Sequence, residues 1–173
     1  CRLTRHAAWI ATNLGEFSRA EQHVGEAQRL AELLGDVREI AFARFVRGNI
    51  AQGLGRMAEA EQEIARALQA FQELDETWAA FAANAVLGMV ALDQGDAALA
   101  EARYQAALRQ SGSGIAARDR AIALCNIAVA QRWQGRLDDA VTHAARALAL
   151  AEGIVAWTAR AGAWQVLARA ALE

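Results

Sequence analysis

The feature that most constrains this sequence is an internal repeat with a period of forty residues. Glycine recurs at positions 15, 55, 95 and 135, and alanine recurs at 20, 60, 100 and 140. A second alanine column occupies 27, 67, 107 and 147, and a small residue stands at 8, 48, 88, 128 and 168. Such a period is typical of repeat architectures, in which each repeat buries its apolar face against its neighbours. The sequence therefore predicts a stack of similar repeats.

Each repeat is predicted to contain two amphipathic helices. In the second repeat, apolar residues follow the i, i+3, i+4, i+7 spacing over 36–53 and again over 57–74. Alanine, the strongest helix former, is abundant, and proline, the weakest, is absent. The glycine between the helices suits a left-handed C-cap, and Gly35-Asp36 and Asp75-Glu76-Thr77 suit a following N-cap. We expect an all-α chain, with later breaks at 111–114 and 152–153.

The alanine columns indicate where the two helices of a repeat approach each other. Antiparallel helices joined by a tight turn come close only where side chains are small. Ala60 and Ala67 lie on one helical face, two turns apart, and are expected to pack against Gly48. Larger neighbours such as Ile64 and Leu68 are expected to fill the flanking space to native density.

These columns resemble the tetratricopeptide repeat. The match covers four repeats (about 1–35, 36–75, 76–115 and 116–153) and a final helix over 154–172. It implies one array over 1–173, a right-handed superhelical solenoid of antiparallel helix pairs with about nine helices. The usual repeat of about 34 residues is shorter by roughly one turn per helix. The sequence also departs from that family's pattern because it lacks the closing proline and most of the expected aromatic residues.

The run Ala27–Asp36 (AQRLAELLGD) resembles a forty-residue subtype of this repeat. That subtype is common in bacterial regulators such as the MalT-like and AfsR-like transcription factors, and in some signalling adaptors. The resemblance implies an ATPase module and a DNA-binding module elsewhere in the chain, with the array sensing an inducer or holding a partner. Because the chain begins with Cys1 and its last helix carries Trp157, Trp164, Val166 and Leu167, we expect a fragment of a longer protein whose array continues. Pairing of two copies through that helix is the alternative.

The composition argues against several kinds of chemistry. All 18 basic residues are arginine, so neither a Walker A lysine nor a Schiff-base lysine exists. The histidines His6, His23 and His143 have no metal-ligand spacing, and Cys125 lies in an apolar helix without a neighbouring histidine. We therefore expect no enzyme activity, no catalytic residue, no metal and no cofactor.

Charge and hydropathy limit the classes of partner that this segment is expected to bind. The net charge is −2 and both signs are mixed along the chain, so we expect neither nucleic acid nor an anionic membrane as a partner of this segment. No run of 18 uncharged apolar residues exists, so no transmembrane helix is predicted. The two cysteines, Cys1 and Cys125, form no framework, which indicates a reducing, cytoplasmic location.

The resemblance implies that the first helix of each repeat lines a concave, partner-binding groove. The expected groove residues are Arg2, Arg5, Trp9, Asn13, Phe42, Phe45, Asn49, Gln52, Met89, Leu92, Ile122, Val129, Arg132, Trp133 and Arg169. Phe42 and Phe45 fit a core role equally well, whereas Trp9, Arg132 and Trp133 are the residue types that dominate interface hot spots.

Such a groove predicts a protein or peptide partner. It lacks the lysine and asparagine ladder that holds acidic tails in related repeats, so an apolar or amphipathic peptide or helix is the expected guest. Other domains of the same chain are a further candidate for the occupant. Three functions stay open: a sensor or interaction segment of a bacterial multidomain regulator, a freestanding adaptor for complex assembly, and a receptor for a small-molecule inducer.

Overall fold

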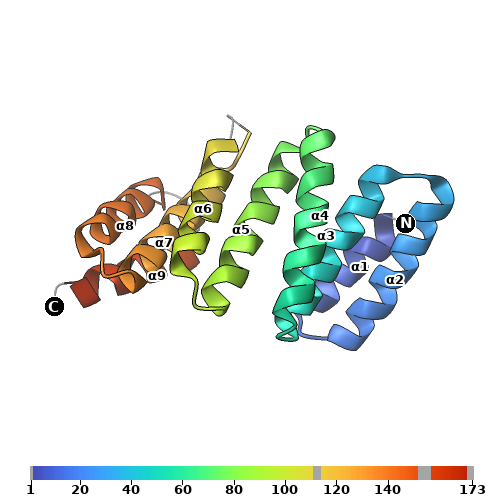
Figure 1. Ribbon diagram of the computed structural model, residues 1–173, viewed down its shortest axis with the longest axis horizontal. Helices are drawn as coiled ribbons and strands as arrows, with labels where there is room; N and C mark the ends of the chain where they lie inside the picture. Colours follow the sequence, from blue (N-terminus) through green and yellow to red (C-terminus); the bar gives the residue numbers. More distant parts are fainter. Residues whose placement is uncertain (1, 111–113, 152–156, 171–173) are drawn as a thin grey trace. The chain divides into compact units, whose positions relative to one another are not determined.

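The computed structural model describes residues 2–110, 114–151 and 157–170, with side chains described for all of these except 157–159 and 170. Over the described residues the chain is all-α and forms nine helices (Figure 1). The helices are α1 (Arg2–Asn13), α2 (Phe17–Leu34), α3 (Val37–Gly53), α4 (Met57–Glu73), α5 (Thr77–Asp93), α6 (Ala97–Gln110), α7 (Ala117–Trp133), α8 (Leu137–Ala151) and α9 (Trp157–Ala170). The prediction of an all-α repeat fold is confirmed.

The helix boundaries follow the forty-residue register closely. The helices predicted over 36–53 and 57–74 are α3 and α4, which differ from the prediction by one residue at one end each. The predicted final helix is α9. Apart from Gly114, the breaks expected at 111–114 and 152–153 lie outside the described residues.

The chain divides into two compact units, Cys1–Val90 and Ala91–Glu173. The division falls inside α5, within the third repeat, and does not coincide with a repeat boundary. The first unit contains α1 to α4 and most of α5, and the second contains α6 to α9. Each unit has its own core and is described separately below.

The recurring glycine ends the first helix of each repeat. Gly15, Gly55, Gly95 and Gly135 have φ values of 74°, 74°, 83° and 75°, the left-handed conformation that glycine adopts without steric cost. At each of these turns the next residue donates a backbone hydrogen bond five residues back, as Arg56 does to the carbonyl of Ala51 at 2.8 Å. This is the Schellman arrangement, which satisfies carbonyls that the helix end leaves without partners. The predicted C-cap is confirmed.

The turn from one repeat to the next uses acidic residues in two ways. The carboxylate of Asp36 accepts a hydrogen bond from the backbone N–H of Glu39 at 3.0 Å, so it caps α3 as expected. Asp75 was expected within an N-cap segment, but it takes the left-handed position equivalent to Gly35, with φ of 54°. Aspartate tolerates this conformation better than most residues because its short side chain bonds locally. At this site the turn geometry set by the repeat therefore determines the conformation of Asp75, and its preference for the N-cap position does not.

The alanine columns form the seam between the paired helices. All eight alanines of the two columns are fully buried. A Cβ placed on Gly48 would lie 2.5 Å from Ile64 Cδ1 and 3.3 Å from the carbonyl oxygen of Ala60. The two helices thus touch where the sequence provides no side chain, and the predicted contact of Gly48 with the alanine face of α4 is confirmed.

Enlarging one seam alanine is expected to destabilise the fold. Ala140→Leu forces three extra carbon atoms into the fully buried seam between α7 and α8, and should lower the free energy of unfolding by about 1–3 kcal/mol. Ala145→Leu is the matched control because Ala145 is exposed on the same helix. Urea denaturation followed by circular dichroism measures both. Equal stability of the two variants would contradict the register.

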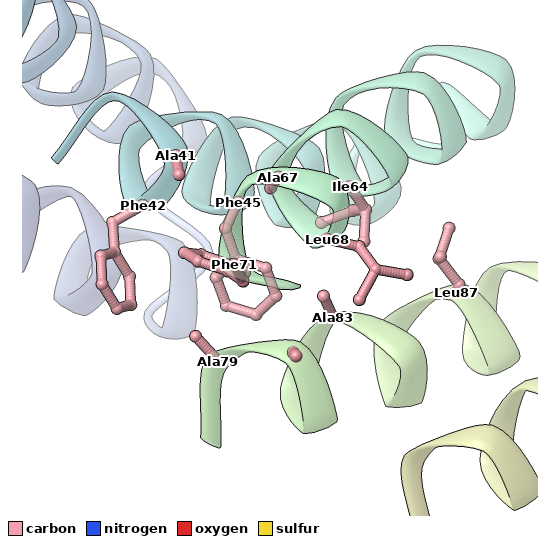
Figure 2. Packing of buried hydrophobic residues seen from close by; sticks show 11 residues of the cluster. Ala41, Phe42, Phe45, Ile64, Ala67, Leu68, Phe71, Ala79, Ala83 and Leu87 are labelled. Carbon is pink, nitrogen blue, oxygen red and sulfur yellow. The ribbon is translucent and has the colours of Figure 1, made fainter. Parts of the chain in front are cut away.

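The core of the first unit is aromatic in its centre. Phe42 and Phe45 of α3 and Phe71 of α4 meet beside alanines of α5, and Leu68 and Leu87 extend the cluster (Figure 2). The Phe42 and Phe71 ring centroids lie 4.8 Å apart at 55°, and those of Phe45 and Phe71 lie 6.1 Å apart at 67°. Tilted and edge-on pairs of this kind add to the stabilisation from burial alone.

The core of the second unit is built mainly from small residues. Alanines of α8 pack against Leu124, Cys125 and Ala128 of α7, and Val166 of α9 closes the cluster. A Cβ on Gly162 would lie 2.5 Å from the Cys125 sulfur, so α9 also approaches α7 through a missing side chain. Val166 and Leu167, two of the apolar residues from which a continuing array was expected, both pack within this unit, whereas Trp164 is exposed. The side chain of Trp157 lies outside the described residues.

A buried carboxylate joins α6 to the end of α7. Glu101 accepts hydrogen bonds from Gln131 at 2.9 Å and Gln134 at 3.0 Å and forms an ion pair with Arg136. Burial raises the pKa of Glu101, but the hydrogen bonds and the charge of Arg136 outweigh burial, so its pKa lies below the ordinary value of 4.5. The folded state therefore favours the ionised carboxylate.

This lowered pKa predicts acid sensitivity. The stabilisation from Glu101 is complete above the unfolded-state pKa and is lost as the pH falls through the folded-state pKa. Glu101→Gln should therefore be less stable than the wild type at pH 7, and the difference should shrink at about pH 3. Glu21→Gln is the control, because Glu21 occupies the same repeat column and pairs with Arg56 in an exposed position. Urea denaturation at both pH values tests this, and a difference that grows on acidification would refute it.

Candidate partner-binding face

Three first helices of the repeats create a pocket on the first unit. Its volume is about 200 Å³, and it is lined by Arg5, His6 and Trp9 of α1, Phe42, Phe45 and Val46 of α3, and Trp78 of α5. Lining residues that belong to different helices are at least 32 positions apart in the sequence. The repeat period brings them together because it places equivalent faces of α1, α3 and α5 side by side.

The pocket combines a buried aromatic floor with exposed tryptophans. Phe42 and Phe45 are 8% and 5% exposed, whereas Trp9 and Trp78 are 37% and 51% exposed. The Trp9 ring stacks on Phe45 with centroids 6.1 Å apart and planes at 18°. Phe42 and Phe45 therefore act chiefly as core residues whose edges reach the pocket, while the two tryptophans present large apolar surfaces to solvent.

A buried ion pair holds one wall of the pocket. Arg5 Nε donates to Glu39 Oε2 at 2.9 Å, and the two side chains are 12% and 4% exposed. The Arg5 guanidinium also lies over the Phe42 ring, 4.5 Å from its centroid, and Arg38 lies over the same ring at 5.0 Å. Arg38 is in turn paired with Glu76. Arg5, which was predicted to line the groove, does line the pocket, and its charge is already matched by Glu39.

The other predicted groove residues of the first unit do not line this pocket. Arg2 is exposed and lies 3.6 Å from Glu39. The side-chain amides of Asn13 and Asn49 donate to the backbone carbonyls of Trp9 and Phe45, so both help to anchor their own helices. Gln52 is half-buried, and Met89 on α5 is exposed.

The remaining predicted residues belong to the second unit. Trp133, at the end of α7, and Arg169, on α9, are exposed, whereas Leu92, Ile122, Val129 and Arg132 are half-buried. None of them lines the pocket of the first unit. The predicted groove residues thus fall into two sets, one in each unit, and members of the first set line the aromatic pocket described above.

Sequence reasoning missed three pocket residues, His6, Val46 and Trp78. Trp78 is the most informative omission because it supplies one of the two exposed rings. It follows the Asp75 turn in the first turn of α5, outside the columns assigned to the groove. A large aromatic residue directly after a polar turn was the available signal, since such a ring has little core to enter.

The reactive side chains do not gather at this pocket. Cys125, which the sequence places in an apolar helix, is buried, and burial raises the pKa of its thiol to about 11, which keeps it protonated and a poor nucleophile. Over the described residues, no three histidine, cysteine, aspartate or glutamate side chains are grouped so as to hold a metal ion. No helix within the described part of the chain has the length and hydropathy needed to span a membrane.

Comparison with solved structures places this arrangement among known folds. BtubC (BKLC) from P. vanneervenii superposes with a TM-score of 0.74 at 19% identity, over 83% of this chain and 59% of that one. The Signal Transduction ATPase with Numerous Domains (STAND) protein with a tetratricopeptide repeat sensor from Pyrococcus horikoshii gives a TM-score of 0.74 at 14% identity, over 87% and 24%. Kinesin light chain TPR-like repeats from Podosopora anserina superpose with a TM-score of 0.76 at 14% identity. This match covers 98% of this chain and 84% of that one.

These likenesses concern the fold. The chain spans 59% of the length of the first of these structures and 24% of the second. No family model matches the sequence, and no curated protein matches it. The helical register, the left-handed glycines and the superpositions together show that the chain is built from tetratricopeptide-like helical repeats.

Proposed function

We propose that this chain is a protein-interaction segment whose first unit binds an apolar side chain of a peptide or amphipathic helix between Trp9 and Trp78. The observation that carries the proposal is the pocket itself, in which two exposed tryptophans flank a buried aromatic floor. Tryptophan is strongly enriched among residues that dominate binding energy, particularly beside desolvated pockets. The proposal makes the segment a binding module and gives it no catalytic role.

The chemistry of the pocket favours an apolar anchor. The charge of Arg5 is matched by Glu39, and that of Arg38 by Glu76, so neither guanidinium is available to pair with an acidic ligand at little cost. The floor is held by packing and by the ion pair, so little ordering is needed on binding. A preorganised pocket retains more of the interaction free energy as affinity.

The partner-binding test uses peptides selected from a phage-displayed random library on the whole chain. Selected peptides should share a large apolar residue, and Trp9→Ala or Trp78→Ala should each weaken their binding by about tenfold or more, as measured by fluorescence anisotropy. Leu34→Ala is the matched control, because Leu34 is exposed on α2 of the same unit and lies outside the pocket. Trp133→Ala should leave affinity unchanged.

The outcomes of this test separate the two candidate faces. If Trp133→Ala lowers affinity while the Trp9 and Trp78 variants bind normally, the partner occupies the second unit and the proposal is wrong. If no peptide is enriched above the level on an unrelated helical protein, the interaction function itself fails.

For the biological setting, we propose a segment of a bacterial multidomain transcriptional or signalling regulator. The AQRLAELLGD run and the likeness to a protein described as carrying a tetratricopeptide repeat sensor support this setting. A freestanding adaptor is the alternative. The complete coding sequence distinguishes them: an adjoining nucleotide-binding module or helix-turn-helix supports a regulator, and an isolated array supports an adaptor.

A further inference from the structure

The second unit contains a different kind of pocket, and we infer that it binds a small amphipathic anion with one acidic head group and an apolar body. The pocket has a volume of about 460 Å³ and is lined by Leu108 of α6, Arg120 and Leu124 of α7, and Arg146, Ala149 and Leu150 of α8. This site shares no residue with the peptide pocket of the first unit. The inference that this pocket binds an anion therefore does not depend on the peptide-binding function proposed above.

The wall of the pocket suits an apolar body. Leu124 is buried in the core of the second unit, and Leu108 and Leu150 are half-buried against the same cluster. Their outer surfaces remain available to a ligand. The volume lies within the roughly 300–1,000 Å³ typical of sites for small organic molecules. Burying an apolar body here would remove it from water without displacing core side chains.

The polar part of the pocket is purely cationic. Arg120 and Arg146 are exposed, and neither forms an ion pair with any residue in the described part of the chain. By contrast, Arg136 in the same unit pairs with two carboxylates. Among the described residues no acidic side chain lines the pocket, and Asp119, next to Arg120 in sequence, is not one of its lining residues. An acidic head group would therefore receive charge-assisted hydrogen bonds from these guanidiniums, with no carboxylate of the described residues already paired with them.

The repeat pattern does not require the residues that line this pocket. One repeat column holds Leu124 in α7 but Arg44 in α3, and another holds Ala149 in α8 but Gln69 in α4. Arg146 has an equivalent in Arg66 of α4, but Arg66 lies 3.7 Å from Glu63. Leu124, Ala149 and Arg120 thus differ from their counterparts in α3 to α5. Arg146 differs from Arg66 in lacking an ion pair with a described residue, whereas the alanines that build the seam recur.

The test uses sodium octanoate as the probe and the whole chain as the protein, with isothermal titration calorimetry as the measurement. Octanoate should bind saturably, and octylamine and octanol, which have an apolar chain of similar length without the negative charge, should bind at least about tenfold more weakly. The double variant Arg120→Gln/Arg146→Gln should lose about tenfold or more in affinity for octanoate. Arg66→Gln is the matched control and should bind octanoate like the wild type.

A second variant tests the apolar part without changing any charge. Ala149→Trp places a large ring in the pocket and should abolish octanoate binding, whereas Gln69→Trp, at the same repeat column on α4, should not. Circular dichroism melts confirm that each variant is folded. Inorganic phosphate is included because tight binding of phosphate alone would show a simple anion site.

Several results would overturn the inference. Because the arginines should repel the ammonium of octylamine, equal binding of octylamine and octanoate would show that the arginines play no part. Unchanged affinity in the double variant has the same meaning. Absence of octanoate binding at about 10 mM, which corresponds to less than about 3 kcal/mol, also rejects the site. Loss of octanoate binding with peptide binding intact would leave the proposed function of the first unit unaffected.

Discussion

Replacing Phe71 by alanine is expected to lower the free energy of unfolding by about 3–5 kcal/mol. Phe71 on α4 is 0% exposed, and its ring contacts the rings of both Phe42 and Phe45. The substitution removes a whole ring from the centre of the first unit, and the helices around it are held in place by other contacts. The vacated space therefore collapses only in part, and the cavity adds to the lost burial.

Urea denaturation followed by circular dichroism measures this loss. Leu34→Ala is the control, because Leu34 is 73% exposed and its truncation should change the unfolding free energy by less than about 0.5 kcal/mol. A loss in Phe71→Ala as small as that in the control would show that the aromatic cluster is not the core of this unit. The variant should also weaken peptide binding, because Phe42 and Phe45 form the pocket floor and rest on Phe71.

The second large effect concerns the Arg5–Glu39 pair. Arg5→Met alone leaves the Glu39 carboxylate buried without its closest cation, and the expected cost is about 3 kcal/mol. Arg2 at 3.6 Å and Arg38 at 4.0 Å from Glu39 are too distant to replace the hydrogen bonds from Arg5, but they keep the loss below that of an isolated buried charge. Glu39→Leu alone should also destabilise the unit, because Arg5 then lacks a partner in a nearly buried position.

The double variant Arg5→Met/Glu39→Leu shows whether Arg5 and Glu39 stabilise the unit as a pair or independently of each other. Replacing both charges by apolar side chains removes the desolvation cost together with the attraction, so the double variant should be much more stable than the sum of the single losses predicts. Urea denaturation of all four proteins completes the cycle. Additive losses would mean that the two residues act independently and that the pair does not hold α1 against α3.

The alternation of helices and turns could be predicted from the sequence because it depends on local backbone properties. Gly55 marks a left-handed turn whatever its surroundings, since only glycine adopts that conformation without cost. Ala60 marks a close approach because no larger residue fits there, as the space around Gly48 confirms. Both properties repeat at a fixed interval, so a helix boundary that is ambiguous in one repeat can be assigned from the equivalent position in the others.

The candidate sites could be predicted only in part, because they depend on contacts between residues that the period does not specify. Trp9 was identified from its residue type and its column, and it does line the pocket. Arg5 was identified on the same basis, but Glu39, 34 positions away, matches its charge. Asp75 shows the same limitation, because its role follows from the turn that it occupies and not from its capping preference.

The sequence by itself determined the all-α architecture, the helix boundaries within about one residue at described positions, and the small-residue seams, since all of these follow from backbone preference and side-chain size. Only the tertiary structure decided which exposed residues act together. Trp78 reaches the Trp9 pocket, and Arg120 and Arg146 reach a common apolar wall, because stacking brings different helices together. Whether a side chain is exposed, and whether its charge is paired, depends on neighbours that are distant in the sequence. A local sequence pattern therefore cannot predict either property.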